Sequence, residues 1–197
     1  MRYSSILVTI VTVTLLSALV TGCSGGNSGP AAPPMTDGVM RHLKAGDQFT
    51  YHVTITQPGQ PQANQVYTES VSAATDPTRL LFDWYDPLTQ YAYYDTAGNL
   101  FVHDDAVPTD VILLPAQLTT GMSTANWSGG AALLVTGPVL LTVPAGTFWT
   151  FKVTDPNANG THDRWYAPAL GYRVREVVIE TSSGLNMTME LTASVTN

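Results

Sequence analysis

The chain has 197 residues, with 8 Lys and Arg against 15 Asp and Glu, and a formal net charge of −7 at pH 7. Proteins that bind nucleic acid or anionic lipid headgroups use clustered Lys and Arg, which this acidic chain lacks. We therefore expect no nucleic-acid partner.

The first 22 residues are typical of a bacterial export signal. Arg2 gives a positive start, and an apolar run follows over residues 6–20. That run is shorter than the ~20 apolar residues of a spanning helix. Residues 20–23 (VTGC) resemble the lipobox of bacterial lipoproteins. The resemblance implies cleavage after residue 22, a Cys23 that carries acyl chains such as palmitate, and membrane contact through that lipid.

Residues 23–38 follow as a predicted flexible tether, rich in Gly, Ser and Pro. Cys23 is the only cysteine, so the exported domain has no disulfide. We expect a protein exported and lipid-anchored to the cell membrane. If the host has two membranes, Ser24 favours the outer one, because inner-membrane lipoproteins of proteobacteria often carry Asp after the lipidated cysteine.

Residues 39–197 are predicted to form one antiparallel β domain. In residues 48–56 the side chains of Phe49, Tyr51, Val53 and Ile55 alternate with polar ones, which is typical of a half-buried strand. The alternation at the end of the chain predicts that Leu185 to Val195 also place apolar side chains on one face. Further strands are expected at 65–74, 79–85, 90–95, 100–103, 133–143, 147–154, 161–166 and 172–181.

Helices are expected to be few or absent. Met40–Ala45 could form one helical turn, and Leu113–Leu118 is expected to be an irregular crossover that contains Pro115. The sequence thus predicts an all-β single domain built on a curved antiparallel sheet or open half-barrel.

Two motifs in the C-terminal half carry a resemblance. Residues 141–154 contain Val-Pro-Ala-Gly-Thr-Phe, and residues 164–176 contain Trp-Tyr-Ala-Pro-x-x-Gly. Together with Gly-Asp-x-Phe-x-Tyr at residues 46–51, they resemble uncharacterised DUF3108-like and TapB9-like bacterial envelope lipoprotein domains. The resemblance implies the fold and location of such domains and no activity. Pro144, Gly146, Pro168 and Gly171 are interpreted as corners between strands.

No catalytic constellation is recognisable, and no cofactor is expected. No serine stands in a Gly-x-Ser-x-Gly frame. The histidines are not spaced as metal ligands, and each is expected to be solvated or hydrogen-bonded. These histidines are His42, His52, His103 and His162. The acidic run from His103 to Asp110 is interpreted as a solvated loop, since the adjacent Asp104 and Asp105 would point to opposite faces of a strand.

An aromatic cluster is the strongest candidate for a ligand surface. Trp84, Tyr91 and Tyr93 lie in neighbouring predicted strands, and alternation places Tyr91 and Tyr93 on one face and Tyr94 on the other. Such rings can stack on a sugar or line an apolar groove, although core packing is the more common role.

Residues 155–163 (DPNANGTHD) open like a calcium-binding loop. Asp155, Asn157, Asn159 and Asp163 could donate oxygen ligands, but Tyr166 stands where a calcium hand needs a bidentate Glu. Asn159-Gly160 is also a strong hairpin signal. We therefore interpret the segment as a hairpin tip and expect no metal site.

These features favour a non-catalytic envelope lipoprotein whose sheet surface binds an apolar ligand or an envelope partner protein. The alternative is a surface carbohydrate-binding module or hydrolase that uses the aromatic face.

Overall fold

The computed structural model describes residues 37–83, 90–106, 110–127, 131–155 and 159–197. The chain divides into two compact units, Met1–Ala32 and Pro33–Asn197. The first unit lies outside the described residues, and all the strands below belong to the second. Three residues that the sequence analysis named as candidate sites lie outside the described residues: Cys23, Trp84 and Asn157.

Every regular element in the described part of the chain is a strand. The strands are β1 (Asp37–Val39), β2 (Gln48–Thr56), β3 (Ala63–Ala73), β4 (Arg79–Phe82), β5 (Gln90–Tyr94), β6 (Leu100–Asp104), β7 (Val111–Leu114), β8 (Gln117–Thr119), β9 (Ser123–Trp127), β10 (Ala131–Val143), β11 (Gly146–Thr154), β12 (Gly160–Ala167), β13 (Tyr172–Glu180) and β14 (Asn186–Val195).

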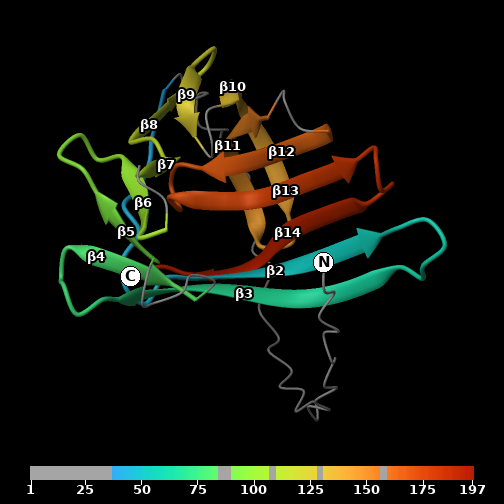
Figure 1. Ribbon diagram of the computed structural model, residues 1–197, viewed down its shortest axis with the longest axis horizontal. Coiled ribbons are helices and arrows are strands. Elements are labelled where there is room, and N and C mark those ends of the chain that lie inside the picture. The colour runs from blue at the N-terminus through green and yellow to red at the C-terminus, as the bar shows by residue number, and fades with distance from the viewer. Residues whose placement is uncertain (1–36, 84–89, 107–109, 128–130, 156–158) are drawn as a thin grey trace, which may run out of the picture. The chain divides into compact units, whose positions relative to one another are not determined.

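The strands form one large, strongly curved sheet and one small pair. The large sheet has the order β10-β11-β12-β13-β14-β2-β3-β4-β5-β6-β7-β9, and β1 pairs with β8. In Figure 1 the strands from β12 to β3 run across the view in this order, while β10 and β11 cross steeply to them. All ladders are antiparallel except β7–β9, which is a single parallel pair, Ile112 with Trp127. Because β9 also pairs with β10, the strand order closes on itself, but this closure depends on the one residue pair between β7 and β9, so the curved sheet is nearly open at that point.

The core fills the inner face of this curvature. Phe49, Tyr51 and Tyr172 are almost fully buried, and the Phe49 and Tyr172 rings lie 4.7 Å apart. The buried core residues come from most of the strands, including Val71, Phe82, Ala92, Leu100, Leu133, Val135, Phe151, Val153, Tyr166, Val174, Met189 and Leu191. Burial of this apolar surface is the main stabilising term for a domain without disulfides.

The predicted all-β fold with a curved antiparallel sheet is confirmed. Phe49, Tyr51 and Val53 point into the core as the alternation of residues 48–56 predicts. Both predicted corners are present: β10 ends at Val143 and β11 begins at Gly146, while β12 ends at Ala167 and β13 begins at Tyr172. The hairpin predicted at Asn159-Gly160 joins the antiparallel strands β11 and β12.

Other sequence expectations were wrong. Met40–Ala45 forms no helical turn. The expected crossover at Leu113–Leu118 contains the end of β7 and most of β8. Asp37 and Gly38, assigned to the tether, pair with β8 as part of β1. Strands this short contain too few residues to show a periodicity.

The alternation of the last strand holds only in part. Met189 and Leu191 are buried as expected, but Val195 is 56% exposed. The register between β14 and β2 shifts between Leu191 and Ala193. Because such an irregularity resets which face the following side chains take, the residues beyond it leave the core.

In the described part of the chain, no helix is long and apolar enough to cross a membrane.

Candidate functional site

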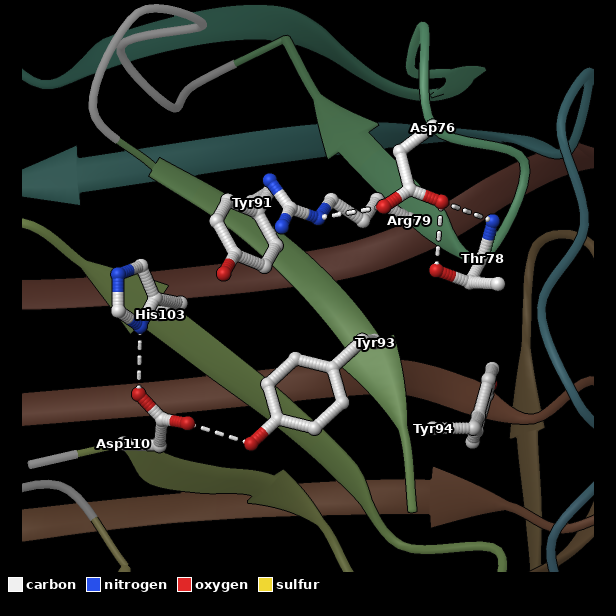
Figure 2. Close-up of a pocket in the computed structure, with 8 residues that line it drawn as sticks. All are labelled: Asp76, Thr78, Arg79, Tyr91, Tyr93, Tyr94, His103 and Asp110. Carbon is white, nitrogen blue, oxygen red and sulfur yellow. Dashed lines mark hydrogen bonds and ion pairs between the residues drawn. The ribbon is translucent and has the colours of Figure 1, made fainter. Parts of the chain in front are cut away.

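An open cleft of about 430 Å³ lies over β4, β5 and β6 and Asp110, which precedes β7. It lies on the outer face of the sheet, because Ala92 between Tyr91 and Tyr93 is fully buried on the core side. Figure 2 shows the residues that line it, which are Asp76, Thr78, Arg79, Tyr91, Tyr93, Tyr94, His103 and Asp110.

Strand register brings the aromatic side chains of the cleft together. Tyr91 on β5 pairs with His103 on β6, and Tyr93 pairs with Phe101. The Tyr91 and His103 rings stack with centroids 4.7 Å apart, and Tyr93 stacks on Phe101 at 5.6 Å. Side chains directly opposite each other on one face of a sheet are expected to make such contacts.

His103 is held between two carboxylates. Its Nδ1 lies 2.7 Å from Asp110 Oδ1, and its Nε2 lies 3.0 Å from Asp105 Oδ1. The hydrogen bond to Asp110, then that to Asp105, raises the pKa of His103. When its imidazole is protonated, His103 donates from both nitrogens to these carboxylates, and neither nitrogen is then free to act as a base.

Asp110 links His103 to Tyr93. The Tyr93 hydroxyl donates to Asp110 Oδ2, while His103 occupies Asp110 Oδ1. These hydrogen bonds, from Tyr93 first and His103 second, lower the pKa of Asp110. In turn, the Asp110 carboxylate raises the pKa of Tyr93 to about 12. The wall of the cleft is therefore a fixed array of hydrogen bonds.

The opposite wall is built on the turn before β4. Asp76 Oδ1 accepts hydrogen bonds from the Thr78 backbone N–H at 2.9 Å and the Thr78 hydroxyl at 2.7 Å. Its other oxygen lies 3.1 Å from Arg79 Nε. The Arg79 guanidinium carbon lies 3.9 Å from the Tyr91 ring centroid, which is a close cation–π contact.

The sequence prediction located part of this cleft. Tyr91 and Tyr93 share its outer face as alternation predicts, and Tyr94 turns toward the core, where its hydroxyl accepts a hydrogen bond from the Leu43 N–H at 2.7 Å. The sequence interpretation missed His103 and Asp110, because it treated residues 103–110 as a solvated loop. Only the pairing of β6 with β5 and β7 brings these two side chains beside the tyrosines.

Of the suspected calcium-loop residues, Asn157 lies outside the described residues, and Asp163 and Asn159 have partners within the protein. Asp163 is buried, and its carboxylate lies 2.8 Å from Lys152 Nζ and accepts a hydrogen bond from Thr154. Asn159 Oδ1 accepts a hydrogen bond from the Thr181 hydroxyl at 2.9 Å. Asp155 and Asn159 line a separate depression of about 320 Å³. Among the described residues, no group of three His, Cys, Asp or Glu side chains could hold a metal.

A second polar cluster lies on the core side of the sheet. Arg173 contacts Glu69 and has its Nε 3.3 Å from Glu176 Oε2, and Arg164 Nε lies 3.0 Å from Glu176 Oε1. The register partners of Glu69 and Glu176 are the core residues Phe49 and Met189. The cluster therefore shares the inner face of the sheet with the apolar core.

The ionisation of this cluster follows from its partners. Burial opposes the charge on Glu176, yet the hydrogen bond from His162 and the charges of Arg173 and Arg164 lower its pKa to about 2. Burial raises the pKa of Glu69, an effect that Arg173 offsets in part. Glu176 is therefore a firmly ionised member of the core-side cluster.

Comparisons with known proteins do not assign a family. No family model matches the chain, and no curated protein matches it significantly. Among solved structures, a protein with a YmcC-like fold from Bacteroides fragilis is 14% identical and covers 80% of this chain and 99% of its own, with a TM-score of 0.37.

Two further solved structures have similarly low sequence identity to this chain. MucB is 10% identical over 78% of this chain and 54% of its own, with a TM-score of 0.38. A LolA superfamily protein from Nitrosomonas europaea is 9% identical over 80% of this chain and 89% of its own, with a TM-score of 0.26. Similarity this distant does not transfer a function, so a function can be inferred only from the site itself.

Proposed function

We propose that this chain is a non-catalytic, lipid-anchored protein of the bacterial cell envelope that binds a saccharide in the cleft formed by β4, β5, β6 and Asp110. The observation that carries the proposal is the cleft itself, where tyrosines stand beside fixed hydrogen-bonding groups on an open outer face. Binding sites for small polar ligands combine aromatic walls with a few polar groups of fixed position.

The contacts already made within the cleft define how a ligand would bind. The Tyr91 ring contacts both Arg79 and His103, and Tyr93 contacts Phe101. The Tyr91 hydroxyl has no hydrogen-bond partner among the described residues, and Figure 2 shows it directed toward the space bordered by His103 and Asp110. A ligand rich in hydroxyl groups matches this arrangement, because it can bond to the Tyr91 hydroxyl and to carboxylate oxygens at the ring edges.

The chemistry of the cleft supports binding without catalysis. His103 has both nitrogens engaged by carboxylates, and Asp110 has a hydrogen bond on each oxygen. Thr78 carries the one aliphatic hydroxyl among the lining residues, and it donates to Asp76. A nucleophile needs a neighbouring base that takes up its proton, and hydrogen bonds lower the pKa of both Asp76 and Asp110, which makes these carboxylates weaker bases.

The test compares two tyrosines. The exported chain carrying Cys23→Ser is titrated with a glycan panel by calorimetry, with and without Tyr91→Ala. Loss of the Tyr91 hydroxyl and ring is expected to weaken binding by about tenfold or more. Tyr67→Ala is the matched control, since Tyr67 is 37% exposed on β3 and outside the cleft. Equal binding with and without Tyr91→Ala, or no binding glycan at all, would contradict the proposal.

A second candidate is an apolar ligand or an envelope partner protein docked on β10. Leu134, Val139 and Leu140 are 47%, 45% and 55% exposed. The adjacent Val139 and Leu140 point to opposite faces of the strand, so the candidate surface is the face that carries Leu140, the most exposed of the three. If this surface is the functional one, Leu140→Asp abolishes capture of a lipid or partner and leaves glycan binding in the cleft unchanged. Mass spectrometry of an organic extract of the purified protein would detect a bound lipid.

Lipid anchoring is tested separately from ligand binding. Cys23 is the only cysteine, so Cys23→Ser removes every site for thioether-linked lipid. We expect wild-type protein in the membrane fraction with incorporated radiolabelled palmitate, and the variant in the soluble fraction without label. Label on the Cys23→Ser chain would overturn the anchor while leaving the cleft proposal intact.

A further inference from the structure

The two cations of the cleft are both committed to partners within the protein. Arg79 Nε lies 3.1 Å from Asp76, and the guanidinium lies against the Tyr91 ring. His103 is held between Asp105 and Asp110. An anionic ligand that approached either cation would also lie close to the carboxylates that already pair with it, and their charge would oppose its binding.

The Asp110 carboxylate, in contrast, can accept further hydrogen bonds. Each oxygen of Asp110 accepts one hydrogen bond from the described residues, and an ionised carboxylate offers about four acceptor positions. The Asp110 side chain is 32% exposed and lines the cleft. The Tyr91 hydroxyl can accept a hydrogen bond as well. A donor-rich cationic group therefore finds several acceptors without displacing a protein contact.

The local charge balance is negative. The single positive charge of His103 faces both Asp105 and Asp110, while Arg79 and Asp76 cancel each other. Asp104, although next to His103 in the chain, pairs with Gln90 on the other face of the sheet and is not among the lining residues, so the negative excess at the cleft comes from Asp105 and Asp110. With the chain as a whole at −7, the field at the cleft attracts cations.

We propose that the saccharide bound in the cleft carries a positively charged amino group, which binds between the Asp110 carboxylate and the Tyr91 hydroxyl. This inference rests on the proposed function and adds the charge of its ligand. Charge-assisted hydrogen bonds from an ammonium to a carboxylate are stronger than those from a hydroxyl, so the amino group would dominate selectivity.

The direct test uses two sugars that differ at the amino group. The exported chain with Cys23→Ser is titrated with a glucosamine oligosaccharide, under conditions where its amines are protonated, and with the N-acetylglucosamine oligosaccharide of the same length. We expect the amino form to bind about tenfold tighter or better. We also expect its affinity to fall as salt rises, because an exposed charge interaction is screened.

A substitution of Asp110 tests whether the preference for the amino sugar arises in the cleft. Asp110→Asn keeps a polar side chain of the same shape and removes the charge, so the preference for the amino form is expected to disappear. Asp155→Asn removes the same charge from a surface outside the cleft and is expected to leave the preference unchanged. Near-ultraviolet circular dichroism checks that both variants keep the wild-type packing.

The outcomes separate the two proposals. Equal binding of both sugars, lost in Tyr91→Ala, would overturn the amino-group inference and leave saccharide binding standing. Tighter binding of a uronic acid oligosaccharide would overturn the inference in the same way. If no glycan of any charge binds, the inference and the proposed function both fail.

Discussion

His103 is the residue on which the geometry of the cleft depends most. It stacks on Tyr91 and bonds to Asp105 and Asp110, so it joins β5, β6 and the start of β7. A histidine held in its charged form contributes its full stabilisation below its ordinary pKa and loses it as the pH rises through its raised pKa. The cleft is therefore expected to be best ordered below neutral pH.

Replacing Asp110 should show directly that its carboxylate raises the pKa of His103. Because Asp110 is the largest cause of the raised pKa of His103, Asp110→Asn is expected to lower that pKa toward its ordinary value. Titration of the His103 ring protons by NMR measures the change. An unchanged His103 titration would contradict the hydrogen-bond arrangement around this ring.

Glu176 gives the molecule a specific sensitivity to acid. Its pKa falls from an ordinary 4.5 to about 2, so its contribution is present above the ordinary value and is lost as pH falls toward about 2. The shift corresponds to about 3 kcal/mol of unfolding free energy.

Denaturant unfolding at about pH 5 and about pH 3 measures this effect. Wild type is expected to lose stability between these values, and Glu176→Gln to lose less, although it is less stable at both. Glu180→Gln, which changes an exposed glutamate on the same strand, should follow wild type. Equal acid sensitivity of wild type and Glu176→Gln would exclude Glu176 as its source.

Among the structural elements, the corner between β12 and β13 is a tightly constrained turn. Gly171 has φ of +70°, and a Cβ there would lie 2.1 Å from the Arg41 carbonyl oxygen. Its N–H donates to the Ala167 carbonyl at 3.0 Å. A side chain is excluded both by the left-handed backbone and by the contact with the segment before β2.

Two glycine substitutions separate these causes. Gly59 has φ of +77°, but a Cβ added there would meet nothing within 4 Å. Gly59→Ala is expected to cost about 1 kcal/mol from backbone strain alone. Gly171→Ala is expected to cost about 3 kcal/mol, because overlap with Arg41 adds to the strain. Denaturant unfolding of both variants measures the difference, and equal costs would show that the contact is relieved by a small backbone shift.

The sequence predicted elements best where side-chain alternation is long and regular. β2 shows this, with Phe49, Tyr51 and Val53 buried as expected. The predicted burial failed after the register shift between Leu191 and Ala193 in β14, because the apolar pattern of the sequence continues unchanged through that shift. Short strands such as β7 and β8 were missed for the related reason that three or four residues define no period.

At the scale of the whole domain, the curvature of the sheet assigns its two faces different roles. The inner face is packed by the core and by the Arg173 cluster, while the outer face carries the cleft. This division could not be predicted from the sequence, because alternation separates two faces without showing which becomes concave. Tyr91 and Tyr93 were predicted as a pair, but their partners His103 and Asp110 depend on how β5, β6 and β7 pair, which alternation within one strand does not show.

We propose that the outer cleft is where this protein binds its ligand. Chemical-shift mapping of the isotope-labelled Cys23→Ser chain, titrated with the tightest binder from the glycan panel, tests it most directly. We predict that the perturbed amides cluster on β4, β5 and β6 and at Asp110. Perturbations confined to β10 or to the inner face around Arg173, or none with any glycan, would contradict it.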